Sequence, residues 1–178
     1  MQNPLHSFRY CPQCGGESFV DYAGRAKRCA DCGLTYFHNV ASAVACLVRN
    51  RAGEYLFVRR AKEPAQGTLD LPGGFVDPME QVEEAVCREI KEETGLVVSE
   101  LRYLCSRPNI YPFSGIDVYT SDLFFLVEVE SFDGAVASDD AAELVVSRLE
   151  AIESEAFGLY SIKRFMAELL ATPEAFIS

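Results

Sequence analysis

The sequence predicts an α/β protein, a sandwich of helices on a mixed sheet, preceded by a small cysteine-rich segment. From Val40 onward, strand-like apolar stretches alternate with segments whose apolar residues recur at helical spacing. Residues 9–38 are short of aliphatic residues and punctuated by glycine, so they cannot build a core unaided. Strands mixed with a few helices favour both parallel and antiparallel pairing. We therefore expect two domains, 1–38 and 39–178.

Each element of the second domain follows from a local pattern of apolar, turn-forming or helix-forming residues. The expected elements are a strand at 40–49, a turn at 50–53, a hairpin partner at 54–60, a Pro- and Gly-rich loop at 61–74, a helix at 79–94, a strand at 96–106, a loop with two prolines at 107–115, a long strand at 118–130, a loop at 131–140, a short helix end running into a strand at 143–152, and a terminal helix at 159–171.

Charge and composition restrict the function. The formal net charge is −11, yet residues 1–38 hold four Lys or Arg against three Asp or Glu. An acidic body disfavours loose, charge-driven binding to nucleic acid, although carboxylates that hold divalent metal would offset part of the excess. No apolar run approaches a membrane span, and the N-terminus lacks a secretion signal. An odd count of seven cysteines fits a reducing compartment, so we expect a cytoplasmic protein.

Four cysteines form a metal-ligand pattern. Cys11 and Cys14, and then Cys29 and Cys32, are two C-x-x-C pairs separated by 14 residues. Each pair can present two thiolates from one tight turn, and the two turns complete a tetrahedron around zinc. Four protein ligands leave no open position, so the zinc is structural, and its binding would supply the folding energy of the segment. The alternative, two disulfides, is disfavoured by the expected compartment.

The helix at 79–94 places carboxylates where a core-facing surface is expected. At about 100° per residue, Glu89 and Glu93 fall on the same arc as the apolar residues, with Glu92 at its edge. Their i, i+3 and i+4 spacing lets the three carboxylates converge. Half-buried like charges are costly unless a cation neutralises them, and such hard oxygen ligands suit Mg²⁺ or Mn²⁺. A solvated acidic helix face is the alternative.

The same stretch resembles the Nudix box, G-x5-E-x7-R-E-U-x-E-E-x-G-U, where U is aliphatic. It matches at every defined position: Gly74, Glu80, Arg88, Glu89, Ile90, Glu92, Glu93, Gly95 and Leu96. The resemblance implies a Nudix α/β/α sandwich and a hydrolase that cleaves a nucleoside diphosphate linked to another moiety, with Mg²⁺ or Mn²⁺.

The resemblance also implies roles for individual residues. Glu89, Glu92 and Glu93 would bind the metal, the carbonyl near Gly74 would add a ligand, and Arg88 and Glu80 would orient the carboxylates. A family segment that delivers a further metal-binding Glu resembles residues 139–146, which makes Glu143 the candidate. The general base is left open between Glu89 and Glu143.

A four-cysteine ribbon before a Nudix domain resembles the NADH pyrophosphatases. Their S-Q-P-W-P-F-P-x-S motif corresponds here to residues 106–115, "SRPNIYPFSG", which lacks the Trp. This loop makes Arg107, Tyr111, Phe113 and Ser114 candidate substrate-binding residues, although its aromatics could simply cap the core. The resemblance further implies a homodimer. This chain departs from the family pattern in the altered motif and in beginning almost at the ribbon, where the family's bacterial enzymes carry a further N-terminal domain.

Three functions remain open. The first is hydrolysis of NAD(H) to AMP and nicotinamide mononucleotide, and the second is the same chemistry on ADP-ribose or another ADP-sugar. The third is a nucleotide-sensing or nucleic-acid-binding regulator without catalysis, which the complete set of box carboxylates argues against. Nucleic acid is otherwise an unexpected partner, except for a NAD-capped RNA end held by the pocket.

Overall fold

The computed structural model describes residues 5–138 and 141–177. The chain forms two compact units, and it passes from the first to the second after Val40, slightly beyond the expected boundary. None of the helices in the described ranges combines the length and apolar character that crossing a membrane requires. The two units are built on different principles.

The first unit is a three-stranded antiparallel sheet. Its strands, in the order β1-β2-β3, are β1 (Phe19–Tyr22), β2 (Ala26–Cys29) and β3 (Thr35–Phe37). The core that this sheet covers is minimal: Cys11, Phe19 and Cys29 are buried, with Leu34 packed against them. So few apolar side chains agree with the expectation that this segment needs more than a core to fold.

The second unit is built on a six-stranded mixed sheet, as predicted. The strand order is β6-β5-β4-β8-β7, and β9 pairs with β5. β4 and β8 are parallel, whereas the other described pairs are antiparallel. The strands are β4 (Ala41–Asn50), β5 (Tyr55–Arg60), β6 (Leu69–Asp70), β7 (Glu100–Phe113), β8 (Ile116–Val129) and β9 (Ala141–Ser147).

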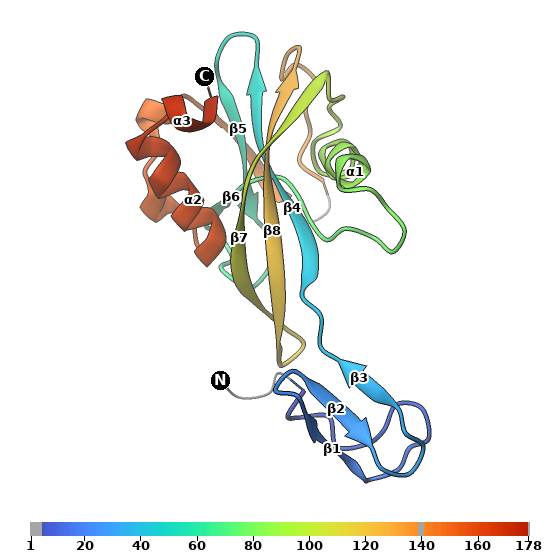
Figure 1. Cartoon of the computed structure of the whole chain (residues 1–178). Helices are drawn as coiled ribbons and strands as arrows, with labels where there is room; N and C mark the ends of the chain where they lie inside the picture. The colour runs from blue at the N-terminus through green and yellow to red at the C-terminus, as the bar shows by residue number, and fades with distance from the viewer. Residues whose placement is uncertain (1–4, 139–140, 178) are drawn as a thin grey trace. The chain divides into compact units, whose positions relative to one another are not determined.

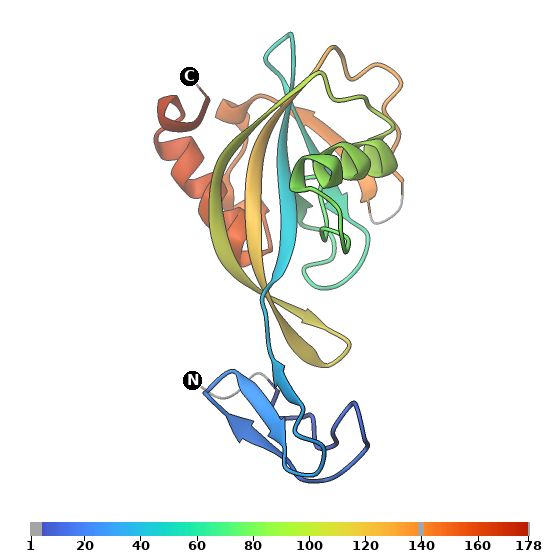
Figure 2. The same cartoon turned by 45° about the vertical axis from the view of Figure 1, so that its right-hand side comes forward.

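Helices cover both faces of this sheet, which confirms the α/β/α sandwich. Figures 1 and 2 show α1 (Val82–Thr94) on one face and α2 (Tyr160–Ala171) with α3 (Glu174–Ile177) on the other. Successive residues of a strand point to opposite faces. Accordingly Ala45 and Leu47 of β4 pack in the cluster under α2, and Val44, Cys46 and Val48 pack under α1. Burial on both faces explains why the strand is apolar at nearly every position.

The ends of α1 follow from local chemistry. The helix begins after Gln81, three residues later than the expected start, because Gln81 and Glu84 form a reciprocal capping box. In this box the Gln81 amide donates to Glu84 Oε2 at 3.0 Å. Gly95 ends the helix in the left-handed conformation with φ 75°, and its amide bonds the Lys91 carbonyl. The helix end expected at residue 94 is thereby confirmed.

The predicted loop at 107–115 is wrong, because β7 continues as a strand to Phe113. Pro108 and Pro112 pair with Ser121 and Asp117 of β8. β7 lies at the end of the strand order, and a proline is tolerated on an edge strand where its missing donor faces away from the partner. The turn follows at Ser114 and Gly115, both with positive φ.

The prediction for 143–152 reversed the order of the two elements. Residues up to Ser147 form β9, which pairs with β5, and short 3₁₀ turns follow at Leu149–Ala151 and Ser154–Ala156. A strand forms here rather than a helix, because Leu144 and Val145 pack against the apolar clusters on opposite faces of the sheet. The other predicted strands and both long helices are confirmed, with shifts of a few residues at their ends.

Candidate functional site

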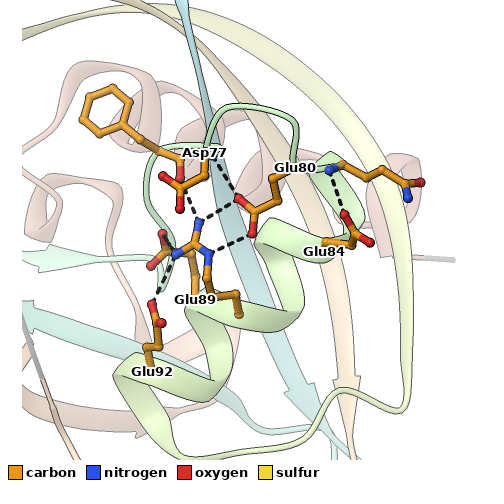
Figure 3. Close-up of polar contacts among 8 residues, drawn as sticks. Asp77, Glu80, Glu84, Glu89 and Glu92 are labelled. Atoms are coloured by element: carbon orange, nitrogen blue, oxygen red, sulfur yellow. Dashed lines mark hydrogen bonds and ion pairs between the residues drawn. The ribbon is translucent and has the colours of Figure 1, made fainter.

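Arg88 contacts three of the box carboxylates at once. Its Nε and Nη2 donate to Glu80 at 2.8 and 2.9 Å, and its Nη1 donates to Glu89 at 2.7 Å and to Glu92 at 3.2 Å. Figure 3 shows Glu80, Glu89 and Glu92 converging on this contact from the loop and from successive turns of α1. The bidentate pairing with Glu80 fixes the plane of the guanidinium, and with it the positions of the other two carboxylates.

Glu80 is held ionised by this arrangement. The Arg88 guanidinium lowers the pKa of Glu80 to about 2, and the backbone amide of Asp77 assists. Arg88 also donates to the Phe75 carbonyl at 3.0 Å, so it ties the loop before the helix to the helix itself. The geometry therefore agrees with an orienting function for both residues.

An added Cβ atom at Gly73 or Gly74 would come too close to neighbouring atoms. A Cβ at Gly73 would lie 2.1 Å from the Val44 carbonyl oxygen, and Gly73 has φ 149°. A Cβ at Gly74 would lie 2.4 Å from Glu89 Oε1. The Gly74 carbonyl oxygen accepts the Val44 amide at 2.8 Å and keeps a second lone pair. The two glycines let the loop pass between β4 and the Glu89 carboxylate.

The three metal-ligand candidates differ in exposure. The Glu89 side chain is 12% exposed and that of Glu92 is 53% exposed, whereas Glu93 is buried and accepts the Gly73 amide at 3.1 Å. Burial, together with the negative charges of Glu93 and Glu89, raises the pKa of the neighbouring Cys46 thiol. The carboxylates thus form a shielded acidic site between the sheet and α1.

These residues fit a divalent cation. Glu89 and Glu92 already lie against one positively charged nitrogen, and carboxylate oxygens are the ligands that Mg²⁺ and Mn²⁺ prefer. Within residues 5–138 and 141–177 the three glutamates do not form a group whose ligand atoms all lie within 4.8 Å of one another. Arg88 lies between Glu89 and Glu92, whereas the Glu93 carboxylate accepts the Gly73 amide instead.

Glu143, the candidate outside the box, lies on β9 opposite Arg59 of β5. Its Oε2 accepts Arg59 Nε at 2.8 Å, and its side chain is 59% exposed. Arg59 also donates to the Gly67 carbonyl at 3.0 Å. In this arrangement Glu143 carries a paired, solvated charge.

A cavity of about 400 Å³ adjoins the carboxylate site. Gly74 and Glu93 belong both to the cavity wall and to the box, and Gly73 directly before the box also lines the wall, so the two features are continuous. Tyr111 and Phe113, two of the substrate-binding candidates, line the cavity, and their rings stack with centroids 6.5 Å apart. The volume lies within the range of about 300–1,000 Å³ typical of small-molecule sites.

The other two substrate-binding candidates lie elsewhere. Arg107 is not among the residues that line this cavity; its Nη2 donates to Glu168 of α2 and its Nη1 to the Ser106 carbonyl. Ser114 occupies the β7–β8 turn with φ 52° and is also absent from the lining. The sequence motif therefore contributes its aromatic residues, rather than its arginine, to the cavity.

The cavity has a polar wall that sequence reasoning missed. Arg60 donates to Asp70 at 2.5 Å and to the Tyr111 hydroxyl at 3.3 Å. Burial raises the pKa of Asp70, while Arg60 opposes the shift. Asp122 accepts Thr120 Oγ1 at 2.6 Å and Ser161 Oγ at 2.5 Å.

A signal for the two carboxylates was present in the sequence. Asp70 and Asp122 are charged residues inside otherwise apolar strand segments, "LDL" and "SDLFFL". Buried charges at such positions need partners, and they often mark a site.

The four cysteines form the predicted zinc site. Their ligand atoms lie within 4.8 Å of one another, with Sγ distances of 3.6 Å for Cys11–Cys32 and 3.7 Å for Cys14–Cys29. The Gly16 amide favours the Cys14 thiolate, but the other three sulfurs outweigh it and raise the pKa of Cys14 to about 12. Four thiolates at this spacing need a cation, and a closed tetrahedral set of sulfur ligands suits structural Zn²⁺.

Comparison with known proteins agrees with the fold and with the site. The NUDIX domain profile matches residues 40–171, and a match over that share of the sequence means that the chain belongs to the NUDIX family. The profile of the NADH pyrophosphatase zinc ribbon domain matches residues 6–37. Within the NUDIX family, the chain is therefore a member that carries this ribbon, and both resemblances seen in the sequence are confirmed. Hydrolases of the family use Mg²⁺ or Mn²⁺.

Curated relatives include proteins described as NAD-capped RNA hydrolase NudC. The one from Vibrio cholerae is 30% identical over 116 residues, or 65% of this chain, and the one from Deinococcus radiodurans is 34% identical over 119 residues. The chain covers 42% of the length of each, so it spans less than half of these relatives. A NUDIX hydrolase from Nitrosomonas europaea has a similar fold, with a TM-score of 0.74 at 21% identity, covering 93% of this chain and 92% of that one.

Proposed function

We propose that this chain is a metal-dependent pyrophosphohydrolase that cleaves NAD(H) to AMP and nicotinamide mononucleotide. One observation carries the proposal: the box carboxylates converge on Arg88 at the edge of a cavity that ends in aromatic side chains. A protein that only binds nucleotides would not need every carboxylate of the set. The curated relatives are described as hydrolases of NAD-capped RNA, which supports the same bond as the target.

We propose that Glu89, Glu92, Glu93 and the Gly74 carbonyl hold Mg²⁺ or Mn²⁺, with Glu143 as a further ligand. When bound, such ions neutralise phosphate charge and acidify the attacking water. Arg88 would give up its contacts with Glu89 and Glu92 when these carboxylates bind an ion, and it would keep its bidentate contact with Glu80. The bidentate Glu80 contact supports this, since it does not depend on the other two carboxylates.

Glu89 is our choice for the general base. Its side chain is 12% exposed, so little bulk water competes for the proton it would accept from the attacking water. Glu143 is 59% exposed and paired with Arg59. Both carboxylates contact an arginine, so the choice rests on the closeness of Glu89 to the other box carboxylates and on its smaller exposure.

The charges around the cavity suggest how the substrate enters. Glu93, Asp70 and Asp122 line the cavity with one cation, Arg60, which is already paired with Asp70. Such a wall repels phosphate, so the pyrophosphate belongs at the metal site and a ring without negative charge belongs inside. Tyr111 and Phe113 offer faces on which a nicotinamide or adenine ring can stack.

The test is a substrate panel with the purified chain in Mn²⁺: NADH, NAD, ADP-ribose, dinucleoside polyphosphates and nucleoside triphosphates, with products identified by mass. We expect AMP and nicotinamide mononucleotide. Glu89→Gln should lower the rate by at least about 100-fold. Glu83→Gln is the matched control, since Glu83 is an exposed acid in the first turn of the same helix.

The alternatives have distinct outcomes in this panel. Preferred release of ribose phosphate from ADP-ribose would replace NAD(H) with an ADP-sugar as substrate. If no compound is turned over in Mg²⁺ or Mn²⁺, the chain is a nucleotide-sensing or nucleic-acid-binding regulator and the hydrolase proposal is wrong. A full rate in Glu89→Gln would remove that residue from the mechanism.

The proposal also covers the role of each domain, the oligomeric state and the compartment. We assign residues 1–38 to the zinc ribbon and 39–178 to hydrolysis, and we propose a homodimer, which sedimentation analysis would detect. Seven unpaired thiols support a reducing compartment, the cytoplasm, where the ribbon cysteines stay available to zinc.

A further inference from the structure

The sheet of the ribbon has two chemically different faces. Successive strand residues point to opposite sides, so Phe19, Lys27 and Cys29 share the inner face. Most of that face is covered: Phe19 and Cys29 are buried, and Lys27 Nζ donates to the Phe8 carbonyl at 2.5 Å while lying 5.5 Å from the centre of the Phe19 ring. Tyr36, which pairs with Lys27 at the edge of this face, is 48% exposed. Asp21 belongs to the same inner set, because Asp21 pairs with Lys27.

The other side, the ribbon outer face, presents Val20, Tyr22, Arg28, Thr35 and Phe37, with the buried Ala26 between the two rings. Tyr22 pairs with Ala26, which in turn pairs with Phe37, so the two rings stand in one row across the three strands. Val20 is 58% exposed, Tyr22 44% and Phe37 42%. With strands about 4.8 Å apart, the two aromatic positions are separated by roughly 9.6 Å.

Both rings of the ribbon outer face carry a guanidinium. Arg28 lies 5.7 Å from the centre of the Tyr22 ring, and Arg25 lies 5.7 Å from the centre of the Phe37 ring. The strand alternation places Asp21 on the inner face, so no carboxylate of the three strands shares this surface. The face is therefore cationic on a chain whose formal net charge is −11.

The combination identifies the chemistry of a partner. Aromatic rings on the open face of a small sheet, flanked by arginines, are how proteins hold single strands: bases stack on the rings, and the cations meet the phosphates. Cation–π pairing also keeps each guanidinium close to a ring on which a base can stack. A protein partner would need apolar area but not two cations beside the rings. A duplex hides its bases and cannot use the rings.

We propose that the ribbon outer face binds single-stranded RNA, with bases stacked on Tyr22 and Phe37 and phosphates paired with Arg25 and Arg28. The proposal extends the proposed function by naming RNA as part of the substrate. It rests on that function only in assuming that the bound strand carries a NAD end. Binding of an uncapped strand requires only the face itself, so the two ideas can fail separately.

The experiment uses the zinc-loaded full chain and a fluorescent single-stranded RNA of about 12 nucleotides without a NAD cap, followed by fluorescence anisotropy. The double substitution Tyr22→Ala, Phe37→Ala should weaken binding by about 10–100-fold, since it removes two stacking positions. Arg28→Gln should weaken binding less and reduce the slope of log affinity against log salt by about 0.7, the value for one phosphate on a single strand.

Matched controls lie on the second unit. Tyr160→Ala removes an exposed ring and Arg51→Gln an exposed guanidinium, and neither should change RNA affinity. Each ribbon variant must retain its zinc by metal analysis. If the double variant loses zinc, Arg28→Glu replaces it as the decisive variant, because it reverses a charge without removing a ring.

Several results would overturn the proposal. These are no RNA binding, equal binding of a duplex of the same sequence, or full affinity in the double variant. A double variant that changes the sedimentation coefficient and leaves RNA affinity intact would assign the face to a second copy of this chain. By contrast, RNA binding by an inactive protein would sink only the hydrolase proposal. With both proposals correct, the double variant hydrolyses free NAD normally and NAD-capped RNA slowly.

Discussion

The two units of this chain hold themselves together by different means. The ribbon buries Cys11, Phe19 and Cys29, with Leu34 beside them, whereas the second unit has an apolar cluster on each face of its sheet. A segment this small cannot offset its conformational entropy by burial alone. In the ribbon, four clustered cysteine sulfurs replace a core. As thiolates they repel one another, and a bound cation removes this repulsion and supplies the folding free energy.

Removing zinc should have the largest effect and should act on one unit alone. Structural zinc contributes about 10–16 kcal/mol in small zinc domains, far more than the ribbon core can replace. We expect chelation to abolish hydrogen-exchange protection of the ribbon strands, including the Cys29 amide that bonds the Leu34 carbonyl at 2.8 Å. Protection of β4 and β5 should persist.

The same comparison can be made with cysteine substitutions. Cys29→Ser should release the zinc, which metal analysis would find at about one per chain in the unaltered protein. Cys87→Ser is the control, because Cys87 is an exposed thiol on α1 outside the four-sulfur cluster. A ribbon that stays protected without zinc would refute the contrast between the units.

Truncating a core side chain of the second unit should destabilise that unit and leave the ribbon unchanged. Phe57 is fully buried and meets Phe157 edge to face, with ring centroids 5.6 Å apart. Phe57→Ala should lower the free energy of unfolding of the second unit by about 3–5 kcal/mol. Denaturant titration measures this loss, and zinc content should stay the same. Loss of zinc in this variant would show that the units do not fold independently.

Gly74→Ala should affect chemistry more than stability. The added Cβ would lie 2.4 Å from Glu89 Oε1, so the carboxylate must move. A displacement of about 1 Å in a catalytic group costs on the order of 100-fold in rate. We expect that loss in NADH hydrolysis, with a melting temperature close to that of the unaltered chain. Ser99→Ala is the control, because Ser99 is an exposed loop residue outside the site. Gly134→Ala would not serve, because Gly134 has a positive φ and an alanine there would be strained.

The smallest effect is expected at a surface ion pair. Arg107 lowers the pKa of Glu168, with help from Arg164. The carboxylate is partly exposed, so Glu168→Gln should cost about 1 kcal/mol or less near neutral pH. A lowered pKa stabilises the fold above the unfolded pKa of about 4.3, and this contribution disappears as pH falls through the folded pKa. Denaturant titrations of both proteins at neutral and acidic pH should therefore converge in acid.

The sequence predicted what depends on short-range patterns. The two C-x-x-C pairs, the helix with its glycine end, and the apolar strands β4, β5 and β8 all carry their signals within a few residues. The failures are long-range. Pro108 and Pro112 indicate a loop when read locally, and only the edge position of β7 makes them acceptable in a strand.

The candidate site divides in the same way. Residues of the box lie on one helix and its preceding loop, so their convergence could be predicted from spacing. The Arg60–Asp70–Tyr111 contact joins three strands, and Asp122 meets Ser161 from α2 across 39 positions of sequence. Neither pairing follows from local spacing, because both are fixed by the order of strands and the docking of α2.

The Arg88 contacts have a consequence for how the acidic site is filled and emptied. Glu80, Glu89 and Glu92 share the positive charge of Arg88, so these carboxylates have a cationic partner within the chain itself. If the proposed hydrolysis is correct, divalent ions could therefore bind and leave in each turnover without refolding of α1. Among the described residues of the ribbon, no cationic side chain belongs to the group of four cysteines. We therefore expect the ribbon to need its zinc for as long as it stays folded.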